Sequence, residues 1–196
     1  DGDDAFNDPE YYYNELLMNT SSRDAVLQVT KNIDSAMKKT PKKQRVVYRG
    51  IVNESHIIQS SGDVDKWIKE HGQLGQTLTF GSYTSTTASV DRARSISGKD
   101  SSGMIFEILT PEGINVTSIS EYKDEKEILL PRNQTYVVVG HKTIIDEYGP
   151  EFNQKVVQLV AINSKGEVLD GTNSDEPPSI ESILEENKKR LDARNN

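Results

Sequence analysis

A helical beginning followed by a series of short β-prone segments is the feature that most limits the fold of this chain. Two helices are expected, from Pro9 to Met18 and from Ser22 to Pro41, followed by short runs rich in Val, Ile and Thr. Helices that come first and strands that follow favour an α+β fold over a repeating βαβ unit. With 196 residues, the chain suits one domain with a short appendage.

The strand predictions are short segments between turn residues. They cover residues 45–48, 77–80, 82–86, 104–109, 114–118, 128–130, 135–145 and 155–162. Short helices are expected at 63–70 and 89–96, and an exposed loop at 97–103. Residues 1–169 are therefore interpreted as one domain, and residues 170–196 as a polar linker with an amphipathic helix over 179–190.

Composition excludes several kinds of site. The net charge of -8 argues against binding along a nucleic-acid backbone, which requires clustered Lys and Arg. The chain has no Cys, and its histidines (His56, His71 and His141) lack metal-ligand spacing, so no metal is expected. No apolar run approaches the roughly 18 residues of a membrane span. The first residues have neither an initiator Met nor a signal-peptide pattern, which indicates a fragment or a processed form.

The first polar motif is Val46-Val47-Tyr48-Arg49-Gly50, an apolar strand that ends in an arginine and a glycine. The guanidinium of Arg49 can hold phosphate through forked hydrogen bonds, and Gly50 lets the backbone approach a flat ligand. The plain alternative is a solvated arginine at the end of an edge strand.

The second motif is the hydroxyl-rich segment from Phe80 to Thr87, which contains Ser85-Thr86-Thr87. Hydroxyl groups on an inner face can orient a carboxylate or a ribose, although an ordinary Thr-rich strand has the same composition. The third motif is the charged loop Ser118–Asp124, which is followed by Glu125-Lys126-Glu127 and an apolar strand. In extended chain Glu125 and Glu127 point the same way. A charged strand edge that prevents aggregation is the alternative interpretation.

In this order the three motifs resemble those of the arginine-directed ADP-ribosyltransferases of the Arg-Ser-Glu class, which include clostridial binary-toxin enzymes, bacterial effectors and phage enzymes. The matching pieces are YRG at 48–50, STT at 85–87 and EKE at 125–127, and the resemblance spans roughly residues 33–162. It implies a split β-sandwich of two packed, mostly antiparallel sheets, with NAD bound in the split. It also implies a protein that is secreted or delivered into a target cell.

The resemblance assigns roles to single residues. Arg49 would contact the diphosphate and ribose of NAD, Gly50 would meet the nicotinamide amide, and Ser85 would orient the catalytic Glu127. Tyr122 occupies the place of an aromatic target-recognition residue. A Glu two residues before the catalytic one accompanies arginine targets in this class, and here it is Glu125.

Two positions depart from the family pattern. The third residue of the usual Ser-Thr-Ser is Thr87, which keeps the hydroxyl group. The aromatic residue that packs on nicotinamide in toxins is missing from residues 90–97, and Ile96 is the candidate for that role.

The implied reaction breaks the bond between nicotinamide and ribose through an oxocarbenium-like transition state, which Glu127 would stabilise. Glu125 would hold the acceptor guanidinium and help to take its proton. No metal is needed. Two other functions stay open: an NAD glycohydrolase, and a silent binding module of a larger toxin. The target protein and the oligomeric state cannot be predicted from the sequence.

Overall fold

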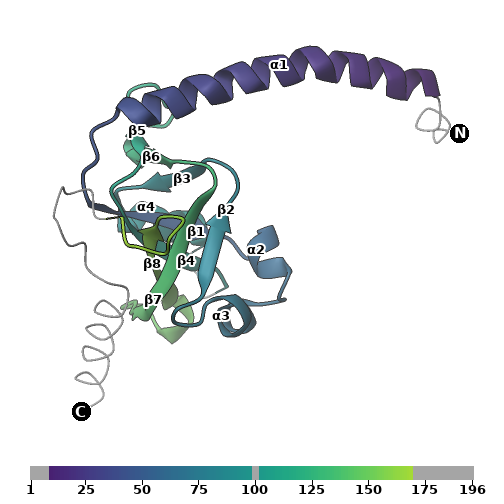
Figure 1. The fold of residues 1–196 in the computed structure, drawn as a ribbon. Coiled ribbons are helices and arrows are strands. Elements are labelled where there is room, and N and C mark those ends of the chain that lie inside the picture. Colours follow the sequence, from purple (N-terminus) through teal and green to yellow (C-terminus); the bar gives the residue numbers. More distant parts are fainter. Residues whose placement is uncertain (1–8, 99–101, 170–196) are drawn as a thin grey trace, which may run out of the picture. The chain divides into compact units, whose positions relative to one another are not determined.

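The computed structural model describes residues 9–98 and 102–169, without the side chains of residues 9–21 (Figure 1). The chain divides into two compact units after Thr40. The linker and helix predicted for residues 170–190 lie outside the described residues, as does part of the loop predicted at 97–103.

The first unit contains one helix, α1 (Pro9–Lys39). The sequence predicted two helices with a break between Met18 and Ser22, and that break is wrong. The residues in between, Asn19 to Ser21, include neither Gly nor Pro. Asn, Thr and Ser lower helix stability by only a few tenths of a kcal/mol each, so the helix continues through them.

The second unit contains all strands of the described chain and the shorter helices. The strands are β1 (Arg45–Ile51), β2 (Thr77–Phe80), β3 (Thr84–Thr87), β4 (Met104–Thr110), β5 (Ile114–Asn115), β6 (Glu127–Leu130), β7 (Gln134–Ile144) and β8 (Gln154–Ile162). The helices are α2 (His56–Gln59), α3 (Val64–His71) and α4 (Val90–Ser97), with 3-10 turns η2 (Lys123–Glu125) and η3 (Pro150–Phe152). The predicted α+β class and the mostly antiparallel strands are confirmed, because only β4 and β8 pair in parallel.

Two elements differ from the sequence prediction. Helix α2 was not predicted; it is a single turn whose N-cap, Ser55, accepts a hydrogen bond from the backbone N–H of Ile58. The strand predicted at 114–118 ends at Asn115, because the side chain of Asn115 accepts from the backbone N–H of Thr117. This Asx turn redirects the chain after two paired residues.

The strands form one sheet in the order β2-β7-β8-β4-β1-β3-β6-β5. Strands β1 and β3 share a single registered pair, Tyr48↔Thr87, whereas β1 and β4 pair along the whole of β1. The sheet therefore separates between β1 and β3 into a five-stranded part and the three-stranded part β3-β6-β5. These parts are the two sheets of the predicted split sandwich, joined at one point.

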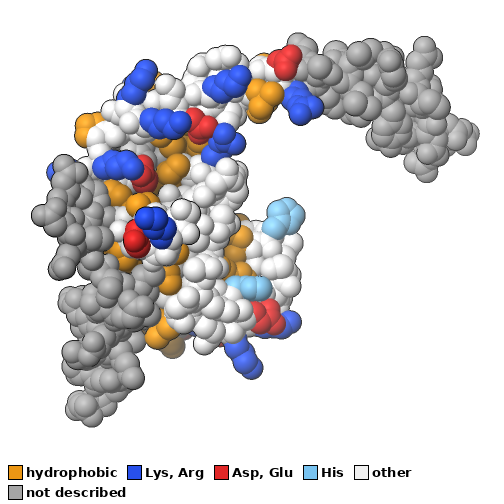
Figure 2. All heavy atoms as spheres, viewed as in Figure 1, with side chains coloured by type: hydrophobic (Ala, Val, Ile, Leu, Met, Phe, Trp, Pro, Cys, Tyr) orange, Lys and Arg blue, Asp and Glu red, His pale blue; other side chains and the backbone are white. Residues whose placement is uncertain are grey.

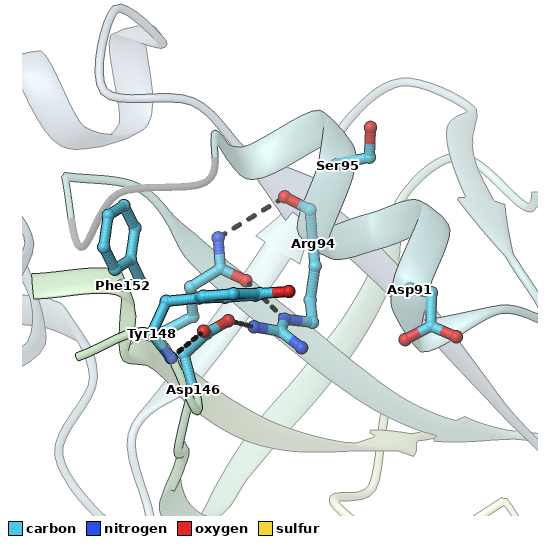
Figure 3. Close-up of a pocket in the computed structure, with 7 residues that line it drawn as sticks. Asp91, Arg94, Ser95, Asp146, Tyr148 and Phe152 are labelled. Atoms are coloured by element: carbon cyan, nitrogen blue, oxygen red, sulfur yellow. Dashed lines mark hydrogen bonds and ion pairs between the residues drawn. The ribbon is translucent and has the colours of Figure 1, made fainter. Parts of the chain in front are cut away.

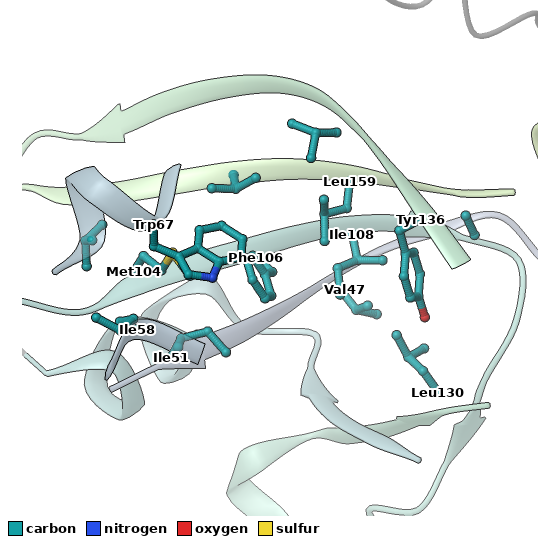
Figure 4. Close-up of a cluster of buried hydrophobic side chains, with 14 of the residues drawn as sticks. Val47, Ile51, Ile58, Trp67, Met104, Phe106, Ile108, Leu130, Tyr136 and Leu159 are labelled. Atoms are coloured by element: carbon teal, nitrogen blue, oxygen red, sulfur yellow. The ribbon is translucent and has the colours of Figure 1, made fainter. Parts of the chain in front are cut away.

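The main hydrophobic core lies between the two parts of the sheet (Figure 4). Phe106 and Tyr136 of the larger part and Leu130 of the smaller part are fully buried in it, and Trp67 of α3 covers Phe106 at a ring separation of 5.6 Å. The preceding residue on β4, Ile105, points to the opposite face and packs on Ala93 of α4. Strand β4 is thus buried on both faces, which explains why five of its seven residues are apolar.

Candidate active site

The separation of β1 from β3 creates a cavity of ≈ 200 Å³. After the pair Tyr48↔Thr87, the antiparallel register would bring Gly50 opposite Ser85, but the two strands no longer pair there. The opening is lined by Tyr48, Arg49, Gly50, Ser85, Thr86, Thr87, Ile96 and Glu125. The three sequence motifs are therefore brought together where the ladder opens.

Ser85 and Glu127 form the central contact of this site. The hydroxyl Oγ of Ser85 donates to Oε1 of Glu127 at 2.6 Å. In the β3–β6 ladder Ser85 lies opposite Leu129, so Glu127 is its diagonal neighbour on the same face of the strands. Regular strand pairing is thus enough to place the hydroxyl beside the carboxylate.

Glu125 reaches the same cavity by a different path from the one predicted. An extended chain was expected to point Glu125 and Glu127 the same way, and this is wrong, because Glu125 ends the turn η2. Lys126 lies in the left-handed region with φ 48°, and the strand begins only at Glu127. A turn, rather than strand alternation, therefore brings the two carboxylates to one site.

Thr87 fixes the backbone of this turn. Its hydroxyl Oγ1 donates to the carbonyl oxygen of Glu125 at 2.5 Å and accepts from the backbone N–H of Ser89 at 3.0 Å. Ser89 is in turn the N-cap of α4. The hydroxyl therefore ties the Glu125 turn to the start of α4, which gives a structural reason for a hydroxyl at this third motif position.

Arg49 supplies a half-buried positive charge to the cavity. Partial burial lowers the pKa of its guanidinium from the usual value, but an arginine stays protonated at neutral pH. Within residues 22–98 and 102–169, no Asp or Glu forms an ion pair with Arg49. Its N–H donors are thus not taken up by a carboxylate of this part of the chain.

The packing of α4 on β1 leaves no room for a side chain at Gly50. A Cβ atom on Gly50 would lie 2.3 Å from the carbonyl oxygen of Ala93 and 2.7 Å from the amide nitrogen of Ser97. The backbone of α4 therefore rests directly on β1 at this position. From the sequence, Gly50 was explained by close approach of the backbone to a flat ligand, and this contact with α4 was not predicted.

We expect Gly50→Ala to destabilise the protein by about 1–3 kcal/mol, the range for overpacking a tight contact. Urea unfolding followed by circular dichroism measures the change. Gly81→Ala is the matched control, because a Cβ at Gly81 meets no atom within 4 Å. Equal stability of the two variants would show that α4 does not need a glycine beneath it.

The two remaining predicted site residues lie at the edge of the site or outside it. Ile96 of α4 lines the cavity and is 40% exposed. Tyr122 lies in the charged loop before η2, is 57% exposed and is not among the residues that line the cavity. Ile119 in the same loop is 84% exposed. The loop thus presents two apolar side chains to solvent.

A larger cavity of ≈ 490 Å³ lies on another side of α4 and contains none of the predicted site residues (Figure 3). It is lined by Asp91, Arg94, Ser95, Asp146, Tyr148, Phe152 and Gln154. Arg94 forms an ion pair with Asp146 there. The backbone N–H of Tyr148 and then the charge of Arg94 lower the pKa of Asp146. The larger of the two cavities is therefore not the one at which the three sequence motifs meet.

The described surface carries mixed charge. On the face that Figure 2 shows, basic and acidic side chains are interspersed. Among the side chains of residues 22–98 and 102–169, no three His, Cys, Asp or Glu are grouped as a metal site would require. No helix in this part of the chain has the length and apolar character to cross a membrane.

A family model described as ADP-ribosyltransferase exoenzyme matches residues 11–166, which include every predicted site residue. The chain belongs to this family. The ADP-ribosyltransferase resemblance found in the sequence motifs is thereby confirmed.

Relatives and solved structures of ADP-ribosyltransferases agree with the family. A protein of Mycobacterium avium (strain 104), provisionally named NAD(+)--arginine ADP-ribosyltransferase Mav, is 27% identical over 153 residues. The match covers 76% of this chain and 16% of that protein, so the chain spans about a sixth of its relative.

Two solved structures share the fold. The enzymatic component C2-I of the Clostridium botulinum C2 toxin at pH 3.0 has a TM-score of 0.54 and 20% identity, covering 71% of this chain and 36% of C2-I. An ADP-ribosyltransferase toxin of Paenibacillus larvae has a TM-score of 0.51 and 20% identity, covering 68% of this chain and 69% of that toxin. At these identities the two structures support the ADP-ribosyltransferase fold.

One residue of the site was missed in the sequence. Arg92 of α4 donates from Nη2 to Oε1 of Glu125, and this hydrogen bond raises the pKa of Arg92. No local pattern indicates the contact, because the two residues are 33 positions apart. Only the placement of α4 against the turn η2 brings them together.

Proposed function

We propose that the chain is the catalytic domain of a mono-ADP-ribosyltransferase that transfers ADP-ribose from NAD to an arginine side chain. The observation that carries the proposal is the hydrogen bond from Ser85 to Glu127 beside a cavity that also contains Arg49. Ser85 holds the carboxylate of Glu127 in place, and Arg49 has no carboxylate partner among the described residues. Together they suit a substrate that carries negative charge at one end and develops positive charge at the other.

NAD would bind with its nicotinamide end in the opening between β1 and β3. A volume of ≈ 200 Å³ is below the roughly 300–1,000 Å³ of pockets that enclose a whole drug-sized ligand, so it fits one end of a dinucleotide. Arg49 would hold the diphosphate through its guanidinium, and the backbone of Gly50 would bond the nicotinamide amide. Ile96 would supply an apolar wall where toxins have an aromatic residue.

Glu127 would act on the sugar. Loss of neutral nicotinamide leaves positive charge on the ribose, and a fixed carboxylate stabilises that charge as it develops. Because Ser85 holds one carboxylate oxygen, the other oxygen is free to face the sugar and its 2′-hydroxyl. Nicotinamide needs no proton to leave, so one carboxylate is enough for the cleavage step.

Glu125 would act on the acceptor. A guanidinium is protonated at neutral pH and is a poor nucleophile until a base takes a proton from it. The side chain of Glu125 is 24% exposed and lines the cavity, so it can receive a guanidinium from solvent. The name of the M. avium relative supports arginine as the acceptor.

The loop Ser118–Asp124 would recognise the target protein, with Tyr122 as its aromatic contact. Its exposed Ile119 and Tyr122 support this role, because apolar side chains on a charged loop are suited to contact with a protein surface.

We further propose that residues 1–169 form the catalytic domain. We also propose that the protein is secreted or delivered into a target cell, as is expected of a toxin or effector.

The direct test incubates the chain with NAD labelled in its ADP-ribose part, together with an arginine-rich protein or agmatine, a small guanidino compound. We expect label on the acceptor and one nicotinamide released for each transfer, with slower release when no acceptor is present. Release without labelled guanidine in any acceptor would favour the NAD glycohydrolase. No consumption of NAD would favour the silent binding module.

A further inference from the structure

Helix α4 carries two arginines, and each is held by a different carboxylate. Arg94 pairs with Asp146 in the larger cavity, where Figure 3 shows its guanidinium beside Tyr148. Arg92, two residues earlier, pairs with Glu125. Residues two apart on a helix point to different sides, so one arginine faces the catalytic carboxylates and the other does not.

The contact between Arg92 and Glu125 resembles the complex expected with a target arginine. Nη2 of Arg92 donates to Oε1 of Glu125, and the side chains are 34% and 24% exposed. The Nε atom of Arg92 is buried and has no hydrogen-bond partner in the part of the chain that the structure describes. The pair therefore uses one hydrogen bond where a guanidinium and a carboxylate can form two.

Arg92 also lies close to the reacting end of the site. Glu125, which it contacts, lines the same cavity as Ser85, the partner of Glu127. The hydroxyl of Thr87 holds the carbonyl of Glu125, so the acceptor carboxylate and Arg92 are fixed relative to β3. Arg92 is not among the residues that line the cavity, but the carboxylate that it contacts is, so its guanidinium is held at the proposed acceptor residue beside the cavity.

We propose that Arg92 is an internal acceptor, so that the enzyme transfers ADP-ribose to its own Arg92 when no target arginine displaces it from Glu125. The inference rests on the proposed function. In the reaction the bond between ribose C1′ and nicotinamide breaks, and its electron pair leaves with neutral nicotinamide. An Nη atom of Arg92 forms the new bond to C1′, and the proton that it loses passes to the carboxylate of Glu125 and then to water.

Self-modification would limit the activity of the enzyme. An ADP-ribosyl group on Arg92 would remain at the rim of the cavity and obstruct Glu125 for the next acceptor. A target arginine that forms two hydrogen bonds to Glu125 competes with the single bond of Arg92 and protects the enzyme. Turnover with a good acceptor is therefore sustained, whereas preincubation with NAD alone reduces it.

The test incubates the full chain with NAD and no acceptor, and follows intact mass and peptide mass. We expect one ADP-ribosyl group per chain, located on Arg92. Because the reaction is intramolecular, its first-order rate constant should not change when the enzyme is diluted. Arg92→Lys should lose the modification, and Arg94→Lys, the matched control on the same helix, should keep it. Added agmatine should slow it.

Three results would overturn the inference: modification of Arg92→Lys at the wild-type rate, a label located elsewhere, or a rate proportional to enzyme concentration. An unlabelled chain that still transfers ADP-ribose to agmatine would overturn it too, while the proposed function stands. If neither the chain nor agmatine is labelled and NAD is not consumed, the proposed function itself fails. Circular dichroism of both variants verifies that each is folded.

Discussion

Replacing Glu127 by glutamine is expected to reduce both NAD cleavage and ADP-ribosyl transfer by about 100-fold or more, the loss seen when one preorganised electrostatic contact to a transition state is removed. The physical reason is the loss of charge alone. Glutamine keeps the shape of the side chain and an oxygen that can accept from Ser85, so the hydrogen bond at 2.6 Å can persist. The negative charge that faces the developing cation disappears.

The measurement compares nicotinamide release and labelling of agmatine at saturating NAD. Glu147→Gln is the matched control, because this exposed carboxylate lies between β7 and β8, outside the cavity. The control should keep wild-type rates, and the thermal stability of both variants should match that of the wild type. A wild-type rate of ADP-ribosyl transfer by Glu127→Gln would show that Glu127 has no catalytic role. The assignment of the whole site would then be wrong.

The contact between Ser85 and Glu127 was expected from the family resemblance, and regular strand geometry explains it. Ser85 and Glu127 are diagonal neighbours in an antiparallel ladder, a relation that depends only on register. The same regularity made most strands predictable, since β4 and β8 are short segments rich in Val, Ile and Leu. The helix at the start was predicted as two because Asn19, Thr20 and Ser21 look like a break, although each lowers helix stability only slightly.

The parts that the sequence could not supply depend on contacts between distant segments. The spacing of Glu125 and Glu127 predicts that both lie in one extended segment. Instead, the left-handed conformation of Lys126 turns Glu125 into the cavity. Gly50 lies against the backbone of α4, whose position no pattern around Gly50 indicates. Arg92 meets Glu125 for the same reason, so the three least predictable features all follow from the placement of α4 and the turn before β6.

Replacing Glu125 by glutamine is expected to separate the two halves of the reaction. Transfer to agmatine should fall by about 100-fold, the lower end of a general-base contribution, because a neutral amide neither holds a guanidinium firmly nor takes its proton. Hydrolysis of NAD should remain near the wild-type rate, since water needs no such partner and Glu127 with Ser85 is unchanged. The variant also loses its ion pair with Arg92, but partly exposed pairs contribute only about 0–1 kcal/mol, so unfolding does not explain the loss.

The same reaction should record nicotinamide release and agmatine labelling, with Glu121→Gln as the matched control. Glu121 is an exposed carboxylate of the loop Ser118–Asp124, so its removal should leave transfer to a small acceptor intact. An equal fall of hydrolysis and transfer in Glu125→Gln would assign Glu125 to the sugar, and the division between the two carboxylates would then be wrong. A fall in transfer alone would show that Glu125 selects a guanidine over water as the acceptor, because both can attack the same ribosyl cation.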